Sequence, residues 1–431
     1  MKLLLVAGAR PNFMKIASIV AALDSHNLRA SDRIDYLLVH TGQHYDEKMS
    51  QTFFRELDLP RTAVDLEVGS GTHAAQTAEI MKRFEPVLVK ERPDAVLLVG
   101  DVNSTIACAL VASKIVYADG TDASDRTRPL IIHVEAGLRS RDRSMPEEIN
   151  RILTDALSDL LFVTEQSAVD NLRREGIARN NIHLVGNTMV DTLLRHRARA
   201  EQSAILQRLG LAGSDPDNQA TLPYGVVTLH RPSNVDDPTA FRNILDALFT
   251  IGQTLPLVFP VHPRTVARIQ EFGLADQCHM LAPHETIPET KAGLYFIEPL
   301  GYLHFLRLMS KARIVLTDSG GIQEETTMLG VPCVTLRNNT ERPVTVSQGT
   351  NVLAGTVKEA IVQQALRQLN RPVNSKKPDL WDGKAGERIV RIMKRTLVKK
   401  QLPRLKDFTL PSDEQQDLGK ASRRHLPVEM L

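Results

Sequence analysis

The sequence is poor in the residues that define several common protein classes. It has three cysteines among 431 residues, and Cys108, Cys278 and Cys333 lie far apart, with no CxxC pair. An odd number of dispersed cysteines argues against a disulfide framework or a thiolate zinc site and is typical of a reducing cytosol. No apolar run approaches the roughly 18 residues of a membrane-spanning helix. We therefore expect a cytoplasmic protein with no membrane partner.

An excess of charge of one sign is also lacking. The chain has 53 Lys and Arg residues against 51 Asp and Glu residues, a formal net charge of +2. This balance gives no reason to expect nucleic acid as a partner, so any attraction for phosphate must be local. The apolar run Leu3–Ala9 soon meets Arg10-Pro11, which favours a buried first strand over a signal peptide.

Short, continuously apolar runs alternate with segments of helical periodicity along the chain. Such runs, rich in Leu, Val and Ile, are typical of parallel strands buried on both faces. They form one set at Leu3–Ala9, Tyr36–Thr41, Ala95–Gly100, Leu130–Val134, Leu160–Thr164 and Ile182–Val185, and a second set at Val226–Leu229, Leu257–Val261, Leu294–Ile297, Arg313–Thr317 and Cys333–Leu336. The pattern predicts an α/β fold of two Rossmann-like domains whose strand ends face one cleft.

The polar segment Gly210–Pro223 is the clearest break in composition between the two strand sets. We expect an N-terminal Rossmann-like domain at residues 1–190 and a C-terminal one at residues 191–383. An amphipathic, basic helix follows at residues 384–400. The remaining residues, 401–431, mix charge, Pro and Gln, and we expect a loosely held tail.

Cations and glycines follow predicted strands in both halves. Arg10 and Lys15 lie where the first strand meets a helix, which suits a phosphate but is equally compatible with an ordinary surface turn. Ser319, Gly320 and Gly321 also open a helix, and the glycines let backbone N–H groups approach a ligand. This is the best phosphate site in the chain. The GxGxxG motif of dinucleotide sites does not occur here, and the GxxxxGK[ST] motif of P-loops occurs nowhere in the sequence, so neither kind of site is supported.

Carboxylates follow predicted strands in the first half. Asp101 is best explained by itself as the cap of the next helix. Glu135 follows a buried run directly, which is costly without a partner and favours a function. The nearby His133 raises the question of a metal, but no third ligand or HExxH pattern accompanies it, so no metal is expected. Glu147 lies in a first helical turn, where acids usually complement the helix dipole.

Two histidines and a glutamate complete the candidates. His230 and His262 each end a predicted strand, where structural and functional roles are about equally expected. Glu325 can hold ribose hydroxyls or be a solvated acid of its helix. Taken together, cations can stabilise a departing diphosphate and carboxylates can move protons. These residues indicate chemistry at a carbon attached to a nucleotide diphosphate.

The same strings closely resemble the non-hydrolysing UDP-N-acetylglucosamine 2-epimerases. They are, in order, GARPNFMK (8–15), TGQH (41–44), GDVNST (100–105), HVEAGLR (133–139), PEEINR (146–151), TLHRPSN (228–234), VHPR (261–264), DSGGIQEE (318–325) and LRNNTERP (336–343). The resemblance implies a glycosyltransferase-B-like fold, usually dimeric, whose final helix crosses back to the first domain. The helix at residues 384–400 then completes the N-terminal domain.

The resemblance also implies roles for individual residues. It makes Asp101, Glu135 and Glu147 the catalytic carboxylates, places His230 at the diphosphate with Arg10, Lys15, Ser319 and Gly320, puts Glu325 on the ribose, and adds Arg337 as an active-site arginine. For Glu147 this replaces the dipole interpretation. The implied reaction inverts C2 by eliminating UDP to a glycal and adding it back. It needs no NAD or other cofactor.

Residues Tyr45–Met49 depart from the HREM or HRQM pattern of members that their own substrate activates, so we expect no such activation. The GQHYDEKM form is also found in relatives that act on modified sugars such as diacetamido-uronic acids. The same C2 chemistry on such a sugar therefore stays open, as do a hydrolysing epimerase, a transferase and a non-catalytic nucleotide-sugar sensor. The expected partners are a UDP-sugar and a second copy of the chain.

Overall fold

The computed structural model describes residues 1–42, 53–117, 128–212, 221–288, 292–372 and 376–401. Its strands form two seven-stranded sheets. The first sheet contains, in spatial order, β3 (Val64–Asp65), β2 (Asp35–His40), β1 (Lys2–Ala7), β4 (Ala95–Val99), β5 (Leu130–Val134), β6 (Leu160–Val163) and β7 (Ile182–Leu184). The second contains β10 (His279–Met280), β11 (Leu294–Ile297), β9 (Leu257–Pro260), β8 (Gly225–Thr228), β12 (Ile314–Thr317), β13 (Cys333–Thr335) and β14 (Asn351–Leu353).

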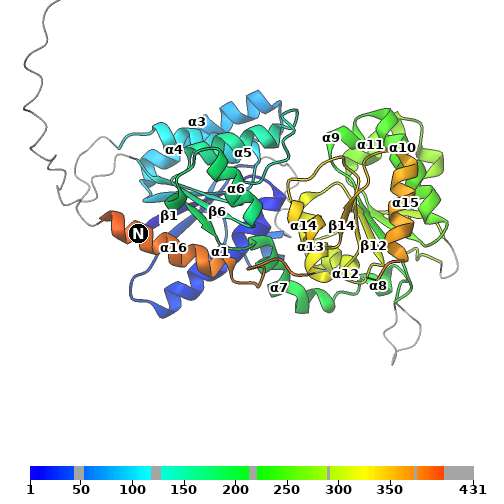
Figure 1. Cartoon of the computed structure of the whole chain (residues 1–431). Helices are drawn as coiled ribbons and strands as arrows, with labels where there is room; N and C mark the ends of the chain where they lie inside the picture. The colour runs from blue at the N-terminus through cyan, green and yellow to red at the C-terminus, as the bar shows by residue number, and fades with distance from the viewer. Residues whose placement is uncertain (43–52, 118–127, 213–220, 289–291, 373–375, 402–431) are drawn as a thin grey trace, which may run out of the picture.

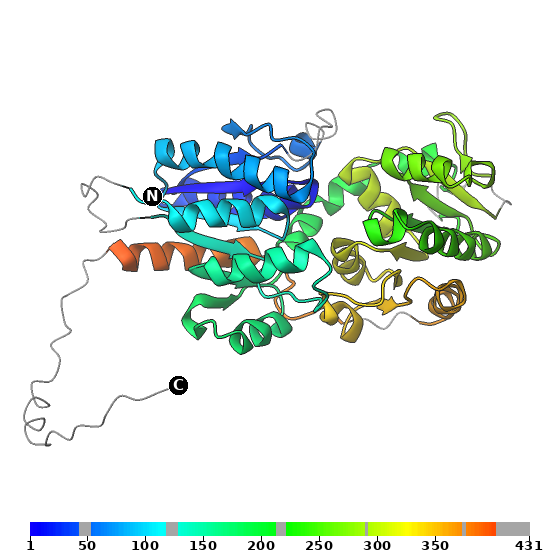
Figure 2. The ribbon, with the colours of Figure 1, turned by 90° about the horizontal axis from the view of Figure 1, so that it is seen from above.

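Helices cover the faces of both sheets (Figure 1). Those around the first sheet are α1 (Arg10–Arg29), α3 (His73–Glu91), α4 (Asn103–Lys114), α5 (Pro146–Leu157), α6 (Gln166–Arg174), α7 (Thr188–Glu201) and α16 (Ala385–Gln401). The others are α8 (Ile205–Arg208), α9 (Pro232–Val235), α10 (Pro238–Gly252), α11 (Pro263–Glu271), α12 (Tyr302–Ser310), α13 (Gly320–Leu329), α14 (Pro343–Ser347) and α15 (Lys358–Leu369). We call each sheet with its helices a lobe. Figure 2 shows the two lobes side by side from above.

The predicted fold class is confirmed, because neighbouring strands pair in parallel throughout both sheets. The central strands are continuously buried, as their apolar runs require. Three strands were not predicted, namely β3, β10 and β14. Each has only two or three residues, with partly or fully exposed positions, so none produces a recognisable apolar run.

The last described helix packs on the first one. Helix α16 contacts α1, and Ile389, Val390 and Met393 join the core of the first lobe. Gly386 permits a close crossing, since a Cβ there would lie 2.6 Å from the carbonyl oxygen of Ser18. Helix α7 contacts α1 as well as α12 and α13 of the second lobe, so it spans the predicted boundary near residue 190.

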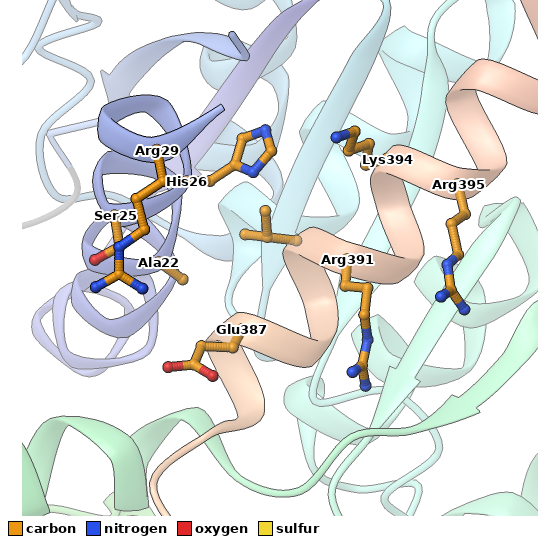
Figure 3. Close-up of a pocket in the computed structure, with 9 residues that line it drawn as sticks. Ala22, Ser25, His26, Arg29, Glu387, Arg391, Lys394 and Arg395 are labelled. Atoms are coloured by element: carbon orange, nitrogen blue, oxygen red, sulfur yellow. The ribbon is translucent and has the colours of Figure 1, made fainter. Parts of the chain in front are cut away.

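A groove of about 690 Å³ lies between α1 and α16 (Figure 3). It is lined mainly by basic side chains, among them Arg29, Arg391 and Arg395. None of the site residues predicted from the sequence lines it.

In the described ranges, no helix combines the length and apolar character needed to cross a bilayer.

Candidate active site

Strand β5 ends in two buried polar residues with different surroundings. His133 is fully buried, with Nδ1 2.6 Å from Asp155 Oδ1 and Nε2 2.8 Å from the carbonyl oxygen of Gly100. Both ring nitrogens are therefore engaged by protein oxygens, which leaves no free lone pair for a metal. The described residues hold no cluster of three or more metal-ligating side chains.

Glu135 leaves the strand in a left-handed conformation, with φ at 72°. Its side chain is buried, and Lys15 donates to Oε1 at 2.7 Å. Arg342, from the second lobe, donates to the same oxygen at 3.0 Å. The other oxygen, Oε2, is buried and has no hydrogen-bond partner among the described residues. An unusual backbone conformation and an unpartnered buried carboxylate oxygen are both typical of functional sites.

Asp101 follows β4 and lies beside the buried guanidinium of Arg151. Burial by itself raises the pKa of Asp101, but the positive charges of Arg151, Lys15 and Arg342 outweigh it and hold that pKa below its usual value. The interpretation of Asp101 as a helix cap is wrong. Helix α4 begins at Asn103, and its N-cap residue, Val102, makes no side-chain cap.

The first turn of α5 carries two acids with different environments. Glu148 is buried and accepts hydrogen bonds from the backbone N–H groups of Ser140 and Arg141, at 3.0 and 2.9 Å. Glu147 is 37% exposed at its side chain, and Oε2 lies 3.9 Å from Arg231 Nη1 of the second lobe. Of these two acids, only Glu147 faces the other lobe. The interpretation of Glu147 as a partner of the helix dipole does not account for its contact with Arg231.

Arg342 is the centre of a buried network in the second lobe. Each of its guanidinium nitrogens faces a different carboxylate: Nη1 lies 2.5 Å from Glu341 Oε1, Nε 2.8 Å from Glu324 Oε1, and Nη2 3.0 Å from Glu135 Oε1. Arg337 adds a second cation, 2.9 Å from the other oxygen of Glu341. The Nη1 atom of Arg337 is buried and has no hydrogen-bond partner in the described part of the chain.

The predicted phosphate loop opens α13, with Ser319 as its N-cap residue. Ser319 does not cap the helix with its side chain, and its N–H donates to Thr317 Oγ1 at 3.0 Å. A Cβ added to Gly320 would lie 2.7 Å from Glu341 Oε1 and closer still to Arg342 Nη1. Gly320 therefore leaves room for the Arg342 guanidinium, while Gly321 lies against Met189 of α7.

Glu325 is buried on α13, which rules out the solvated-acid interpretation. Its Oε1 accepts a hydrogen bond from the Tyr302 hydroxyl at 3.1 Å. Burial, with the neighbouring Glu324 carboxylate, raises the pKa of Glu325 to about 8. The neighbour is itself affected, since burial raises the pKa of Glu324 to about 7 against the opposing charge of Arg342.

The remaining candidates lie further out. His230 is 58% exposed at its side chain, with Nδ1 3.0 Å from the fully buried Asp318. His262 is exposed at the start of α11, where its ring accepts a 3.4 Å hydrogen bond from the backbone N–H of Arg264. Arg10 opens α1, but its side chain lies outside the described part of the structure. The same is true of the whole segment Tyr45–Met49.

The buried ion pairs around the site include residues that were not predicted from single motifs. Arg342, Glu341, Glu324 and Arg151 are all buried and ion-paired, but each stands in a polar stretch without an apolar run to mark it. The only signal in the sequence was their place inside the strings PEEINR, DSGGIQEE and LRNNTERP.

Fold and site together define a class: an α/β protein of two parallel sheets in which ion-paired carboxylates lie between two lobes. A family model described as UDP-N-acetylglucosamine 2-epimerase matches residues 26–394. The chain belongs to this family.

Several known proteins are similar over nearly their full length. The UDP-N-acetylglucosamine 2-epimerase of Methanocaldococcus jannaschii is 43% identical over 395 residues, which is 91% of this chain and 99% of that protein. Its crystal structure in complex with UDP-GlcNAc and UDP matches with a TM-score of 0.79, covering 92% of this chain and 100% of that one at 42% identity. A Pseudomonas aeruginosa protein named UDP-2,3-diacetamido-2,3-dideoxy-D-glucuronate 2-epimerase is 38% identical, over 90% of this chain and 98% of its own.

Proposed function

We propose that the protein reversibly epimerises UDP-N-acetylglucosamine to UDP-N-acetylmannosamine at C2. Family membership and the similarity to the Methanocaldococcus jannaschii enzyme support this substrate. The single observation that carries the chemistry is the buried Glu135 carboxylate, with two cations on Oε1 and an unpartnered Oε2. Such an oxygen can take or give a proton where no water competes.

Several carboxylates are needed because C2 of a 2-acetamido sugar is not adjacent to a carbonyl group. Its proton is too weakly acidic for simple removal. In an elimination, a base takes the C2 proton, the C–H electron pair forms a C1=C2 double bond, and the bond between C1 and the diphosphate oxygen breaks. UDP leaves with the electron pair of the broken C1–O bond. In the reverse direction a diphosphate oxygen attacks C1 while a proton reaches the opposite face of C2.

This reaction requires one group on each face of the sugar ring. Glu135, Asp101 and Glu147 are the three carboxylates proposed to share the two roles. Positive charge holds the pKa of Asp101 low, so it is a carboxylate at neutral pH. Glu147 belongs to the first lobe and faces Arg231 of the second, as a group acting between the lobes should.

The binding roles are proposed from the same placement. Gly320 and Gly321 present backbone N–H groups at the start of a ten-residue helix, where an anion is favoured, and Ser319 is its N-cap residue, whose hydroxyl does not cap the helix. We assign them to the diphosphate, with Arg10, Lys15, His230 and His262 contributing positive or hydrogen-bonding groups. Glu325 is assigned to the ribose and Arg337 to the substrate. We expect the N-terminal domain to end near residue 190 and to be completed by the helix at 384–400. We expect the whole protein to assemble as a homodimer.

Proton NMR of UDP-GlcNAc with the enzyme in heavy water tests the proposal. The expected result is an equilibrium mixture with UDP-ManNAc and deuterium at C2 of both sugars. Stoichiometric free N-acetylmannosamine with UDP would instead identify a hydrolysing epimerase. Binding without any exchange would identify a nucleotide-sugar sensor.

A second candidate substrate is a UDP-2,3-diacetamido uronic acid with the same C2 chemistry. The similarity to the Pseudomonas aeruginosa protein favours it, as does the buried, unpartnered Nη1 of Arg337, which can receive a carboxylate. A panel of UDP-2-acetamido sugars, with and without the uronate and 3-acetamido groups, should be assayed for C2 exchange. The sugar with the highest kcat/KM identifies the substrate.

A further inference from the structure

We propose that Arg342 is a positioning residue that makes Glu135 competent for proton transfer only when the two lobes are together. The inference rests on the proposed function, since it assigns a role within the same site. The two cations that contact Glu135 come from different lobes. Lys15 belongs to the first lobe, as Glu135 does, whereas Arg342 belongs to the loop between β13 and α14 of the second lobe.

The two ion pairs therefore depend differently on the arrangement of the lobes. The contact between Lys15 and Glu135 joins helix α1 to the end of strand β5 within one lobe and does not depend on where the second lobe lies. The contact between Arg342 and Glu135 exists only while the lobes meet. Relative motion of two lobes is the ordinary expectation for enzymes of this architecture, and closure commonly completes a catalytic site.

Arg342 also determines which oxygen of Glu135 is free. Both cations bind Oε1, and Oε2 is left buried and unpartnered. With Lys15 alone, the carboxylate can rotate and exchange its two oxygens. A second donor from the opposite lobe fixes the plane of the carboxylate, so that the proton is taken or given at Oε2.

Two carboxylates of the second lobe hold Arg342, Glu341 by a hydrogen bond and Glu324 by an ion pair. Glu341 and Glu324 engage two of its nitrogens, and the absence of a side chain at Gly320 leaves space for the guanidinium. A buried guanidinium with a carboxylate on every nitrogen cannot relocate without leaving a buried charge unpaired. Arg342 is therefore pre-organised in the second lobe and brings its Nη2 to Glu135 as a fixed donor.

A neighbouring contact between the lobes supports the same picture. Arg342 is the N-cap residue of α14, and the backbone N–H of Val344 in that helix faces the Glu165 carboxylate of the first lobe and acts to lower its pKa. Glu165 follows β6 as Glu135 follows β5, and burial raises its pKa to about 7. Two adjacent strand ends of the first lobe thus face donors from one short segment of the second.

The first test compares Arg342→Lys with the double variant Arg342→Gln/Glu324→Gln. The double variant removes the guanidinium together with the carboxylate that its loss would strand, while Glu341 keeps Arg337 and Glu135 keeps Lys15. We expect kcat for C2 exchange to fall roughly a hundredfold, the effect of a displaced catalytic group, with the Kd for UDP changed less than about threefold. Arg342→Lys should recover part of the loss.

A comparison of kcat with KM separates positioning from mere stability. A misplaced Glu135 carboxylate should lower kcat in the double variant while KM for the UDP-sugar changes less than about threefold, whereas partial unfolding would lower the amount of active enzyme and leave the kcat of the folded fraction unchanged. The charged groups shown to face Glu135 are Lys15 and Arg342, with the Glu324 carboxylate behind Arg342. Arg128→Gln is the matched control, because it breaks an arginine–carboxylate pair with Asp159 at the opposite end of β5. It should leave both kcat and KM unchanged.

A second readout does not need activity. Hydrogen exchange should show the amide of Val344 protected in the wild-type enzyme with UDP and exchanging at least about tenfold faster in the double variant, with the sheets unaffected. Wild-type levels of both kcat and Val344 protection in the folded double variant would overturn the role of Arg342. Failure of the wild-type enzyme to exchange C2 of any UDP-sugar would overturn the proposed function instead, and the Val344 protection would then decide on Arg342 alone.

Discussion

Glu325→Gln tests the unusual ionisation of the second lobe. Glu325 is buried on α13 and accepts a hydrogen bond from Tyr302. Its pKa is raised from 4.5 to about 8, first by burial. Because the folded-state pKa exceeds the unfolded value, the folded protein binds more protons between pH 4.5 and 8, and the free energy of unfolding falls as pH rises through that window. Glutamine has nearly the same shape and cannot ionise.

The gap between 4.5 and about 8 sets the magnitude. At 1.36 kcal/mol per pKa unit it corresponds to on the order of 5 kcal/mol at pH 9. The variant should therefore differ little from the wild type in free energy of unfolding at pH 5, and should exceed it progressively towards pH 9. If the second lobe unfolds as a unit, the difference at pH 9 equals roughly 10–20 °C in Tm.

Urea unfolding from pH 5 to pH 9 measures this difference, with the exposed Glu359→Gln of α15 as the control. The control removes a solvated carboxylate from the same lobe, and its difference from the wild type should stay flat with pH. A flat difference for Glu325→Gln as well would refute the reasoning, because it would mean that the carboxyl group ionises in the folded protein at no cost.

Three further changes probe the site between the lobes. Glu135→Gln should lower kcat for C2 exchange by about a thousandfold while the calorimetric Kd for UDP is retained, and normal turnover would remove Glu135 from proton transfer. Gly320→Ala should reduce kcat about as strongly as the loss of Arg342, because the added Cβ occupies the space of its guanidinium; an unaffected kcat would show that the guanidinium moves freely. A strong chelator should leave turnover unchanged, because both nitrogens of His133 are engaged by protein oxygens, and inhibition would contradict that.

The fold was largely predictable because each sheet is made of strands buried on both faces. β5 and β11 have the predicted limits, and the other predicted strands differ by one or two residues at one or both ends. These runs are continuous and apolar because helices cover both faces, so burial leaves a direct record in the sequence. Short edge strands such as β14 leave no such record, since pairing along one edge needs no apolar run.

The site was predictable only where a polar residue interrupts an apolar run. Glu135 could be singled out for that reason, since it follows β5 directly. Asp101 was misjudged, because a cap and an ion-paired carboxylate look alike in sequence and only the buried Arg151 distinguishes them. No single motif identified Arg342, whose only signal was its place inside the string LRNNTERP. Its partners come from three separate segments, and no local pattern records a contact across two lobes.

The packing of α16 on α1 has a consequence for folding during translation. The strands of the first lobe are complete once Leu184 has been made, but α16, which buries part of α1, ends at Gln401. At a synthesis rate of about 5–20 residues per second, roughly 10–45 s pass between the synthesis of Leu184 and that of Gln401, and α16 cannot cover the apolar face of α1 before then. The second lobe, whose strands lie between residues 225 and 353, can finish folding in that interval. The lobe synthesised first is thus the one completed last, and the apolar face of α1 stays exposed while the second lobe is made.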